Sequence, residues 1–406
     1  MSKEKVIVSA PARQAEMYVK GMMGAKPLVP FDYRKLEAAA KEKMTPEAAG
    51  YILGGAGSDD TIRENHDAFA KYRIHPRMLR DVSNRDTSVE LFGETIPAPL
   101  LTCPIGVLEM VHKEAGKAVG RAMSKLGLPM IISNQASFSM EDITAEMGDG
   151  PRWFQLYWSK SNELVKSLVQ RAEKCGCSAI AVTLDTTMLG WRVQDLDLMF
   201  LPFLRGQGIA QYTSDPVFNT IVKNMDFGDE SMLPPNVDPD TFKSVQAFTG
   251  VYSRPSITWE DLAFLRSVTD LPILLKGIMH PEDGALAVKY GVDGIIVSNH
   301  GGRQVDGAMA AIDALPKVVA AVRKAGSDMP ILMDSGIRTG AHVFKALALG
   351  AKAVCVGRPH CYGLTLAGQE GVEAVMSNLM ADFELTMALA GCKDLSEIGK
   401  ETLEVL

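Results

Sequence analysis

"GIIVSNHGGRQVDG" (294–307) begins as a strand and ends as a turn that carries a titratable ring and a cation. Its first four residues are apolar without alternation, which is typical of a strand buried on both faces of a parallel sheet. Two glycines then end the strand pattern and favour a tight turn. His300 and Arg303 lie three residues apart on that turn. The segment therefore predicts a buried parallel strand whose carboxyl end carries functional side chains.

Seven other short apolar stretches resemble this strand, and helical patterns follow them. Continuous apolar strands that alternate with helices predict a parallel sheet with both faces covered. Eight such strands favour a (β/α)8 TIM barrel. A doubly wound open α/β sheet is the alternative, because periodicity alone does not show whether a sheet closes. The seven stretches are "PLLTCPIG" (99–106), "PMIIS" (129–133), "WFQLYW" (153–158), "AIAVTLD" (179–185), "PILLKG" (272–277), "PILMDSG" (330–336) and "AVCVGRP" (353–359).

The rest of the chain divides around these strands. Residues 1–90 have helical patterns, with Thr45 a predicted N-cap before Pro46, and we expect them to form a helical N-terminal segment packed on a barrel formed by 91–406. The fourth strand is followed by about 60 residues rich in Pro, Gly, Asp and Met, without a strong period. A loop of that length is either functional or disordered. Because it starts at the catalytic face of a barrel, we expect 197–257 to form an active-site lid.

Composition excludes several classes of function. A net charge of −7 gives no electrostatic footprint for nucleic acid or an anionic membrane. No apolar run reaches the roughly 18–20 residues of a membrane span, and the N-terminus lacks the apolar core of a signal peptide. The six cysteines fit neither a zinc pattern nor a secreted disulfide framework. We therefore expect a cytoplasmic protein with reduced cysteines, no metal site and neither nucleic acid nor membrane as a partner.

Polar side chains follow nearly every predicted strand. In a barrel the carboxyl ends of the strands converge on one mouth, so these side chains are predicted to form a site. The glycine-rich turns "DSGIRTG" (334–340) and "VGRPH" (356–360) each lead into a helix, a pattern that favours phosphate binding after the last two strands. Lys276 can place a positive charge against a cofactor that gains electrons. The strand-end residues are Gln155, Tyr157, Thr183, Asp185, Lys276, Ser298, His300, Asp334, Gly357 and Arg358.

Five motifs together carry a family resemblance: "GYILGGAGSDD" (50–60), "WFQLY" (153–157), "LKGI" (275–278), "SNHGGRQ" (298–304) and "DSGIRTG" (334–340). From about residue 30 to about residue 395 the chain resembles the FMN-dependent α-hydroxy acid oxidase family, with the motifs in family order. The resemblance implies an FMN-binding (β/α)8 barrel, which agrees with the strand count. It also implies an enzyme that oxidises a 2-hydroxy acid.

The resemblance further implies a role for each matching position. His300 would be the active-site base, and Asp185 would hydrogen-bond it and stabilise the imidazolium. A guanidinium pair suits the planar carboxylate of a 2-hydroxy acid, and histidine is suited to accept its hydroxyl proton. The residues implied to bind substrate are Tyr51, Tyr157, Arg192 and Arg303, with Tyr157 also at the catalytic centre through the substrate hydroxyl. The residues implied to bind FMN are Pro104, Ile105, Gly106, Ser133, Gln155, Thr183, Lys276, Ser298, Asp334, Gly336, Arg338, Gly357 and Arg358.

The long insertion favours one branch of this family. "LGWRVQDLDLMFLPFLRGQGIAQYTSDPVF" (189–218) resembles the lactate 2-monooxygenases, which would oxidise L-lactate with O2 and decarboxylate the product to acetate, CO2 and water. The alternative is a 2-hydroxy acid oxidase that releases the keto acid and hydrogen peroxide. A flavin-binding barrel without turnover is a third alternative. Met188 is expected on the pocket wall, where it would admit larger acids. Relatives of this kind imply a homo-oligomer, a tetramer or larger.

Overall fold

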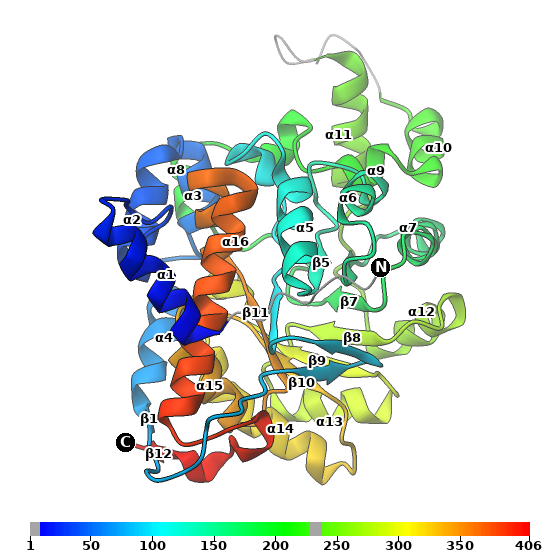
Figure 1. The fold of residues 1–406 in the computed structure, drawn as a ribbon. Helices are drawn as coiled ribbons and strands as arrows, with labels where there is room; N and C mark the ends of the chain where they lie inside the picture. Colours follow the sequence, from blue (N-terminus) through cyan, green and yellow to red (C-terminus); the bar gives the residue numbers. More distant parts are fainter. Residues whose placement is uncertain (1–8, 228–237) are drawn as a thin grey trace.

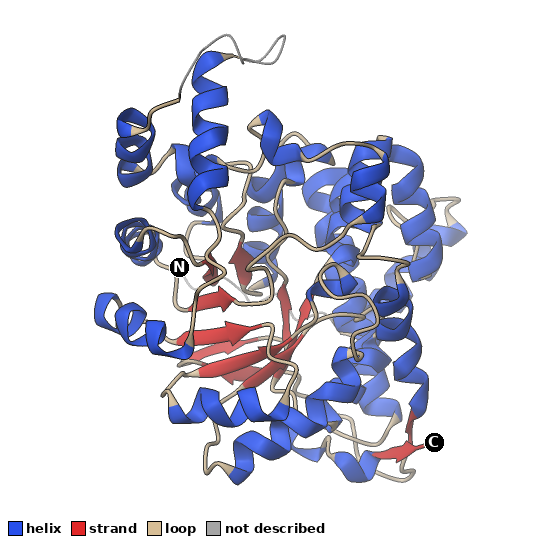
Figure 2. Cartoon of the chain, turned by 180° about the vertical axis from the view of Figure 1, so that it is seen from behind, coloured by secondary structure: helices blue, strands red, loops and turns tan. Residues whose placement is uncertain are grey.

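The computed structural model describes residues 9–227 and 238–406. Its centre is a closed barrel of eight parallel strands in the order β10-β11-β4-β5-β6-β7-β8-β9 (Figures 1 and 2). The predicted (β/α)8 barrel is confirmed, and the open-sheet alternative is wrong. Each predicted stretch contains one barrel strand. The strands are β4 (Leu100–Thr102), β5 (Met130–Ile132), β6 (Arg152–Tyr157), β7 (Ile180–Thr183), β8 (Ile273–Lys276), β9 (Gly294–Val297), β10 (Ile331–Met333) and β11 (Ala353–Val356).

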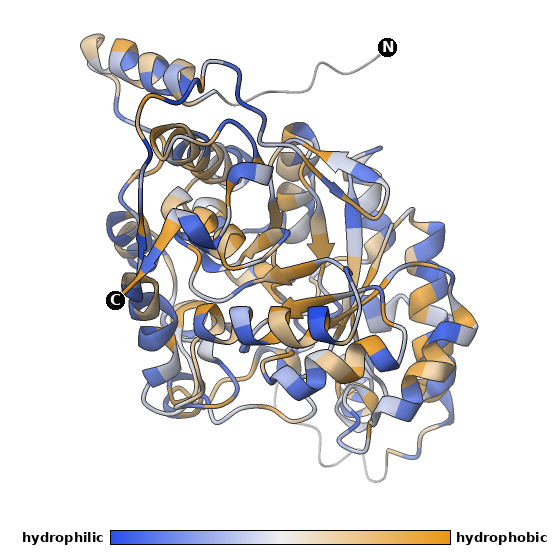
Figure 3. Cartoon of the chain, turned by 90° about the horizontal axis from the view of Figure 1, so that it is seen from below, coloured by the Kyte–Doolittle hydropathy of each residue, from blue (hydrophilic) through white to orange (hydrophobic). Residues whose placement is uncertain are grey.

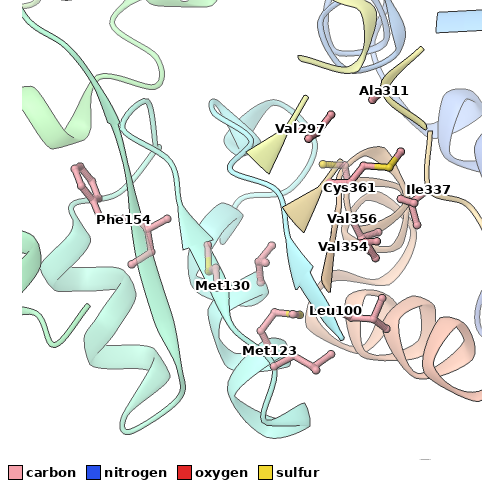
Figure 4. Packing of buried hydrophobic residues seen from close by; sticks show 14 of the residues in the cluster. Leu100, Met123, Met130, Phe154, Val297, Ala311, Ile337, Val354, Val356 and Cys361 are labelled. Carbon is pink, nitrogen blue, oxygen red and sulfur yellow. The ribbon is translucent and has the colours of Figure 1, made fainter. Parts of the chain in front are cut away.

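Both faces of the barrel sheet are buried, which is why the strands are apolar without alternation. Ile296 of β9 belongs to a core cluster inside the barrel, whereas its neighbour Ile295 packs against the outer helices. Successive strand residues point to opposite faces, so each strand supplies both cores. Figure 3 shows these apolar strands at the centre of the molecule, and Figure 4 shows Met123 beside Leu100 in the outer core.

A helix follows each barrel strand and covers its outer face. Ridges of apolar side chains on these helices bury the outward residues of the strands, which makes the helix ring part of the core. The covering helices are α5 (Ala115–Leu126), α6 (Met140–Met147), α7 (Asn162–Lys174), α12 (Leu262–Val268), α13 (Pro281–Lys289), α14 (Ala311–Lys324), α15 (Gly340–Ala348) and α16 (Arg358–Leu389).

The N-terminal part of the chain is helical up to Asp67. Its helices are α1 (Ala10–Met22), α2 (Tyr33–Lys43), α3 (Pro46–Leu53) and α4 (Asp60–Asp67). The predicted N-cap is confirmed, because the side chain of Thr45 accepts a hydrogen bond from the backbone N–H of Ala48 at 3.2 Å. α1, α2 and α3 contact α16 on one side of the barrel, and α4 contacts the turn at His300–Gly302 (Figure 1).

Two small sheets outside the barrel were not predicted. Strand β1 (Tyr72–Ile74) pairs antiparallel with β12 (Leu403–Val405), which ties the N-terminal segment to the end of the chain. Strands β2 (Val89–Leu91) and β3 (Glu94–Ile96) form a hairpin, and Val89, Leu91 and Ile96 join the core inside the barrel. The hairpin therefore closes the amino-terminal end of the barrel and leaves the carboxyl end of the strands for a site.

The insertion between β7 and α12 contains helices rather than an irregular loop. They are α8 (Val193–Asp197), α9 (Ala210–Thr213), α10 (Pro216–Asn224) and α11 (Pro239–Val251), with a 3₁₀ turn at Pro202–Arg205. α10 and α11 project at one end of the molecule (Figure 1). Part of the predicted lid, 228–237, lies outside the described residues. Among the described residues, no helix combines the length and apolar character needed to cross a bilayer.

A buried ion pair anchors this insertion to the barrel. Asp215, which is fully buried, accepts hydrogen bonds from Arg171 of α7 at 3.0 Å and from the hydroxyl of Ser167 at 2.8 Å. Its other oxygen accepts from the N–H of Val217 at 2.8 Å and so caps α10. Arg171 also donates two bonds to Glu141 of α6. Asp215 therefore joins α10 to α7, and Arg171 extends the link to α6.

We predict that Asp215→Ala lowers the free energy of unfolding by about 3–5 kcal/mol, because it leaves the Arg171 charge buried without this partner. Lys20→Ala is the control, because it removes an exposed ion pair with Glu16 and should change that free energy by less than about 1 kcal/mol. Urea unfolding followed by circular dichroism measures both. Equal effects of the two substitutions would contradict the anchoring role.

Candidate functional site

A cavity of about 1300 Å³, open mouth included, lies at the carboxyl ends of the barrel strands. The loops after β4, β5, β9, β10 and β11 contribute to its wall, as do the N-terminal segment and the insertion. The sequence-predicted residues that line it are Tyr51, Pro104, Ile105, Gly106, Ser133, Tyr157, Arg192, Lys276, His300, Arg303, Asp334, Gly336, Arg338, Gly357 and Arg358. Those that lie behind the wall are Gln155, Thr183, Asp185 and Ser298, which hydrogen-bond to lining residues or to one another.

The centre of the cavity holds a histidine–carboxylate pair. Nδ1 of His300 lies 2.7 Å from Oδ1 of Asp185. The hydroxyl of Thr186 lies 3.0 Å from the same carboxylate oxygen and 3.2 Å from the same ring nitrogen. A carboxylate on one ring nitrogen fixes the tautomer and the orientation of an imidazole. Nε2 is thereby the nitrogen of His300 that is available to a ligand.

Burial and charge set the protonation of this pair. Burial lowers the pKa of His300, the Asp185 charge opposes that shift, and the positive charge of Lys276 adds to it. Burial acts to raise the pKa of Asp185, but the charges of His300 and Lys276 outweigh burial and lower it to about 2. At neutral pH the pair is therefore a neutral imidazole beside a carboxylate. Such a pair can accept a proton on Nε2 and stabilise the resulting imidazolium.

A buried ammonium group lies on the floor of the cavity. Nζ of Lys276 donates to Ser298 Oγ at 2.9 Å and lies 3.4 Å from Asp334 and 3.9 Å from Asp185. Burial acts to lower the pKa of Lys276, but the two carboxylates outweigh it and raise the pKa. The lysine therefore stays charged, and it supplies a fixed positive charge to whatever occupies the floor.

Opposite the floor, two arginines and a tyrosine form a cationic face. Nη1 of Arg303 donates to Gly54 O at 2.6 Å, and its guanidinium lies 5.0 Å from the ring centroid of Tyr51. Burial and the charge of Arg192 lower the pKa of Arg303 to about 9, so it remains protonated at neutral pH. Burial raises the pKa of Tyr51 to about 12, which keeps its hydroxyl a donor. Two guanidinium groups held close together favour the binding of an anion between them, because the anion offsets their mutual repulsion.

The turns after β10 and β11 form the other end of the cavity. Gly336 has φ +100°, and a Cβ there would lie 2.2 Å from the backbone oxygen of Asn65, so only glycine fits. Gly357 is the N-cap of α16, and α15 begins at Gly340. Helix N-termini beside glycine turns present free N–H groups to a phosphate. The side chain of Arg338 also lines this end.

Arg358 is placed differently from what its implied phosphate role suggests. Its guanidinium donates to the carbonyl oxygens of Ile52 at 3.0 Å, Gly301 at 2.9 Å and Gly54 at 3.2 Å. The side chain therefore joins α3 to the histidine turn, and Arg358 also lines the cavity.

A row of buried polar side chains crosses three strands beside the cavity. Gln155 of β6 accepts from Ser133 Oγ at 3.2 Å and donates to Thr183 Oγ1 of β7 at 3.0 Å. A flat heteroaromatic ring needs such in-plane donors and acceptors. The ammonium floor, this row and the glycine turns together fit the three parts of FMN, namely the ring edge, the ring and the phosphate.

Sequence reasoning missed several residues of the site. Thr186 and Gln304 lie next to predicted residues, and their polar side chains within the motifs were signals that could have found them. Gln304 accepts from Arg192 at 3.2 Å and donates to Asp185 O at 2.7 Å. Asp195 of α8 is buried, and burial raises its pKa while Arg303 and Arg192 oppose that shift. Nothing local in the sequence marks it.

The cavity wall on the insertion side is apolar and partly aromatic. The residues of the insertion that line it are Leu201, Phe203, Phe248, Thr249 and Tyr252. Phe203 packs 6.3 Å from Tyr51 and 5.6 Å from Phe248 between ring centroids. The expected wall position of Met188 is wrong: its side chain is 67% exposed, because the loop turns outward there, and only its backbone oxygen is tied to the site through Gln304.

A barrel mouth with a neutral histidine, a fixed ammonium group and glycine turns at two helix N-termini is suited to a flavin-dependent oxidoreductase. The family model of the FMN-dependent dehydrogenases matches residues 40–405. The chain belongs to this family, and FMN is its cofactor.

Individual relatives agree with the family assignment. An L-lactate oxidase of Lysinibacillus sphaericus is 44% identical over 389 residues, which cover 96% of each chain. The 2-hydroxyacid oxidase 1 of Homo sapiens is 39% identical, over 90% of this chain and 94% of its own. Among solved structures, mandelate oxidase with (S)-4-hydroxymandelic acid is similar with a TM-score of 0.79 and 34% identity, covering 92% of this chain and 98% of that one.

We predict that Gly336→Ala is purified with less than a tenth of its FMN, because the added Cβ meets the backbone of α4 and displaces the turn. Gly326→Ala is the matched control: Gly326 has φ +84° with open space around it, so the substitution costs about 1–2 kcal/mol of stability and leaves FMN bound. The ratio of flavin to protein absorbance after gel filtration measures the retained cofactor. Full retention in Gly336→Ala would contradict this placement of the phosphate end.

Proposed function

We propose that the protein oxidises a small L-2-hydroxy acid, with L-lactate as the first candidate and O2 as the final electron acceptor. The observation that carries the proposal is that His300, a neutral imidazole held by the Asp185 carboxylate, lines the same cavity as Arg192 and Arg303. A 2-hydroxy acid has a carboxylate for the arginines and an adjacent hydroxyl for the histidine. The L-lactate oxidase relative supports the substrate, and the (S)-configured ligand of the mandelate oxidase supports the L-enantiomer.

The residues of the chain divide the work by their chemistry. Arg192 and Arg303 would grip the substrate carboxylate, because planar guanidinium groups match it better than lysine does. Nε2 of His300 would accept the hydroxyl proton, and the Asp185 charge would stabilise the imidazolium. FMN, when bound, supplies the acceptor for the electron pair and the α-hydrogen. Lys276 would offset the negative charge that a reduced flavin ring carries.

We further propose that the insertion acts as a lid that retains the keto acid. Its apolar residues Phe203, Phe248 and Tyr252 line the cavity on the side away from the barrel floor. A closed apolar roof excludes water and slows product release. Retained pyruvate would be decarboxylated. The overall reaction would then convert one L-lactate and one O2 to one acetate, one CO2 and one water, which balances. This is the outcome that the insertion favours.

A second outcome is an oxidase that releases its product before decarboxylation. L-lactate and O2 would then give pyruvate and hydrogen peroxide. The L-lactate oxidase relative, whose identity of 44% extends over 96% of the chain, supports this candidate. The two outcomes share the same first half-reaction and differ only in how long the keto acid stays in the cavity.

Anaerobic mixing with L-lactate, D-lactate, glycolate and L-mandelate tests the reaction class. We expect L-lactate to bleach the flavin absorbance of the native protein, whereas His300→Gln should keep its FMN but bleach at least 100-fold more slowly, since a positioned base contributes at least that factor. A flavin that no 2-hydroxy acid bleaches would contradict the proposal and favour the barrel without turnover.

Aerobic turnover of carbon-labelled L-lactate in the presence of catalase separates the two outcomes. Catalase removes free peroxide, which would otherwise decarboxylate released pyruvate in solution. Labelled acetate under these conditions supports decarboxylation inside the cavity. Labelled pyruvate in stoichiometric yield supports the oxidase and contradicts retention by the lid.

We predict that Asp185→Asn moves the acid limb of the rate of flavin reduction to lower pH. A base acts only when unprotonated, so the rate rises with pH through the pKa of His300. Asp185 raises that pKa, and its removal therefore lowers it. The limiting rate should also fall by about 100-fold or more, because the imidazolium loses its counter-charge.

Thr186→Val is the control for this pH profile, because it removes the hydroxyl that contacts both groups but leaves the Asp185 charge in place. Its acid limb should stay close to that of the native protein. Anaerobic stopped-flow measurement of flavin bleaching from pH 4 to pH 8 gives all three profiles. A limb that moves to higher pH in Asp185→Asn would contradict the assigned charge interaction.

A further inference from the structure

The turn that carries His300 has an unfavourable backbone conformation. His300 has φ +58°, Gly301 φ +64° and Gly302 φ +78°, so three consecutive residues lie in the left-handed region. Glycine adopts that region freely, but a histidine is uncommon there. The turn therefore requires partners from outside, because the isolated segment would not hold it. Those partners decide where the imidazole points.

Hydrogen bonds reach the turn from several elements. The N–H of His300 donates to Ser298 Oγ at 3.0 Å, and the N–H of Gly301 donates to Ser335 Oγ at 3.0 Å. The N–H of Gly302 donates to the side-chain oxygen of Asn299 at 3.2 Å. The same N–H also donates to the backbone oxygen of Asn299 at 3.1 Å, so Asn299 holds the last amide of the turn through both its side chain and its carbonyl group. The position of Asn299 in turn depends on what holds its side chain.

Asn299 is held by a reciprocal amide pair with Asn65 of α4. Nδ2 of Asn65 donates to Oδ1 of Asn299 at 2.8 Å, and Nδ2 of Asn299 donates to Oδ1 of Asn65 at 2.7 Å. Both side chains are buried, with 2% and 7% exposure. The N–H of Ala311 also donates to Oδ1 of Asn65 at 3.1 Å. Because the N–H groups of Gly302 and Ala311 both require an oxygen, the orientation of each amide is fixed.

Asn65 itself does not line the cavity. It lies in the N-terminal segment, 234 residues before its partner. Any effect of the Asn65 side chain on the reaction must therefore pass through its hydrogen-bond partners, Asn299 and Ala311. A buried polar network with every member satisfied is rigid, and it becomes costly when one member is lost.

We propose that Asn65 is a positioning residue of the reaction: through its amide pair with Asn299, it holds the left-handed His300–Gly302 turn and thereby aims the imidazole. The N-terminal segment is then part of the catalytic apparatus and not only a cover for the barrel. This inference rests on the proposed role of His300 as the base.

Thr61 supplies a matched control on the same helix. It is also fully buried, and its hydroxyl donates to Val305 O at 2.9 Å and accepts from the N–H of Ala308 at 3.0 Å. Thr61→Val therefore removes two bonds between α4 and the 305–308 loop and keeps the residue shape. It weakens the docking of the helix without touching the amide pair.

The experiment measures the limiting rate of flavin reduction by L-lactate, per bound FMN, in Asn65→Ala, Asn299→Ala, the double variant and Thr61→Val. We expect a loss of at least tenfold in each asparagine variant, and a double variant within twofold of Asn299→Ala because both act through one pair. Thr61→Val should stay within twofold of the native protein. Asn65→Asp keeps the size of the side chain but replaces the donor to Asn299 by a carboxylate oxygen and adds a buried charge, and it should lose at least threefold.

Hydrogen–deuterium exchange of the apoprotein gives a readout that does not depend on activity. The peptide containing 299–303 should exchange faster in Asn65→Ala and Asn65→Asp than in Thr61→Val. A native reduction rate in Asn65→Ala, an equal loss in Thr61→Val, or fully multiplicative losses in the double variant would each overturn the inference. If L-lactate does not bleach the flavin of the native protein, the proposed function fails together with this inference. If L-lactate bleaches the native protein and both asparagine variants at the same rate, only this inference is overturned.

Discussion

The buried charge network under the cavity is the constraint on which the rest of the site depends. Lys276 lies within 3.9 Å of both Asp185 and Asp334, and Asp185 in turn holds His300. A buried lysine would ordinarily lose its proton, and a buried carboxylate would ordinarily gain one. Here Lys276 and Asp185 keep their charges because each lies beside a group of opposite charge. Burial and the charge of Lys276 lower the pKa of His300 and leave it neutral, so one network sets the protonation of Lys276, Asp185 and His300.

The barrel makes this network possible because it brings distant strand ends together. Asp185 follows β7, Lys276 ends β8, His300 follows β9 and Asp334 follows β10, and these four strands are neighbours in the sheet. Their register places Thr183 beside Lys276 and Lys276 beside Ile296. Small displacements of one strand would separate charges that cannot be left unpaired. The close packing of both cores therefore supports the electrostatics as well as the fold.

Much of this architecture was predictable from the sequence, and the limits have physical causes. The eight strands are buried on both faces, so they stand out as apolar runs, and polar residues at their ends mark the mouth. The pairing of β1 with β12 has no signal in the sequence. Three-residue strands are too short to show an alternation of apolar and polar residues, and the two strands lie more than 300 residues apart. Met188 was misplaced because a strand-end motif does not show where the loop turns outward. Asn65 and Asp195 act through tertiary neighbours that no local pattern reveals.

The arginine face differs from the floor in how its charge is balanced. Among the described residues, no direct ion pair forms with Arg192 or Arg303, and both arginines act on the charge of the buried Asp195. A substrate carboxylate would complete this face. A 2-keto acid keeps the same carboxylate, so the arginines hold product as firmly as substrate and cannot themselves decide when it leaves. In the proposed reaction, the timing of release therefore depends on another part of the cavity wall, which Phe203, Phe248 and Tyr252 of the insertion line.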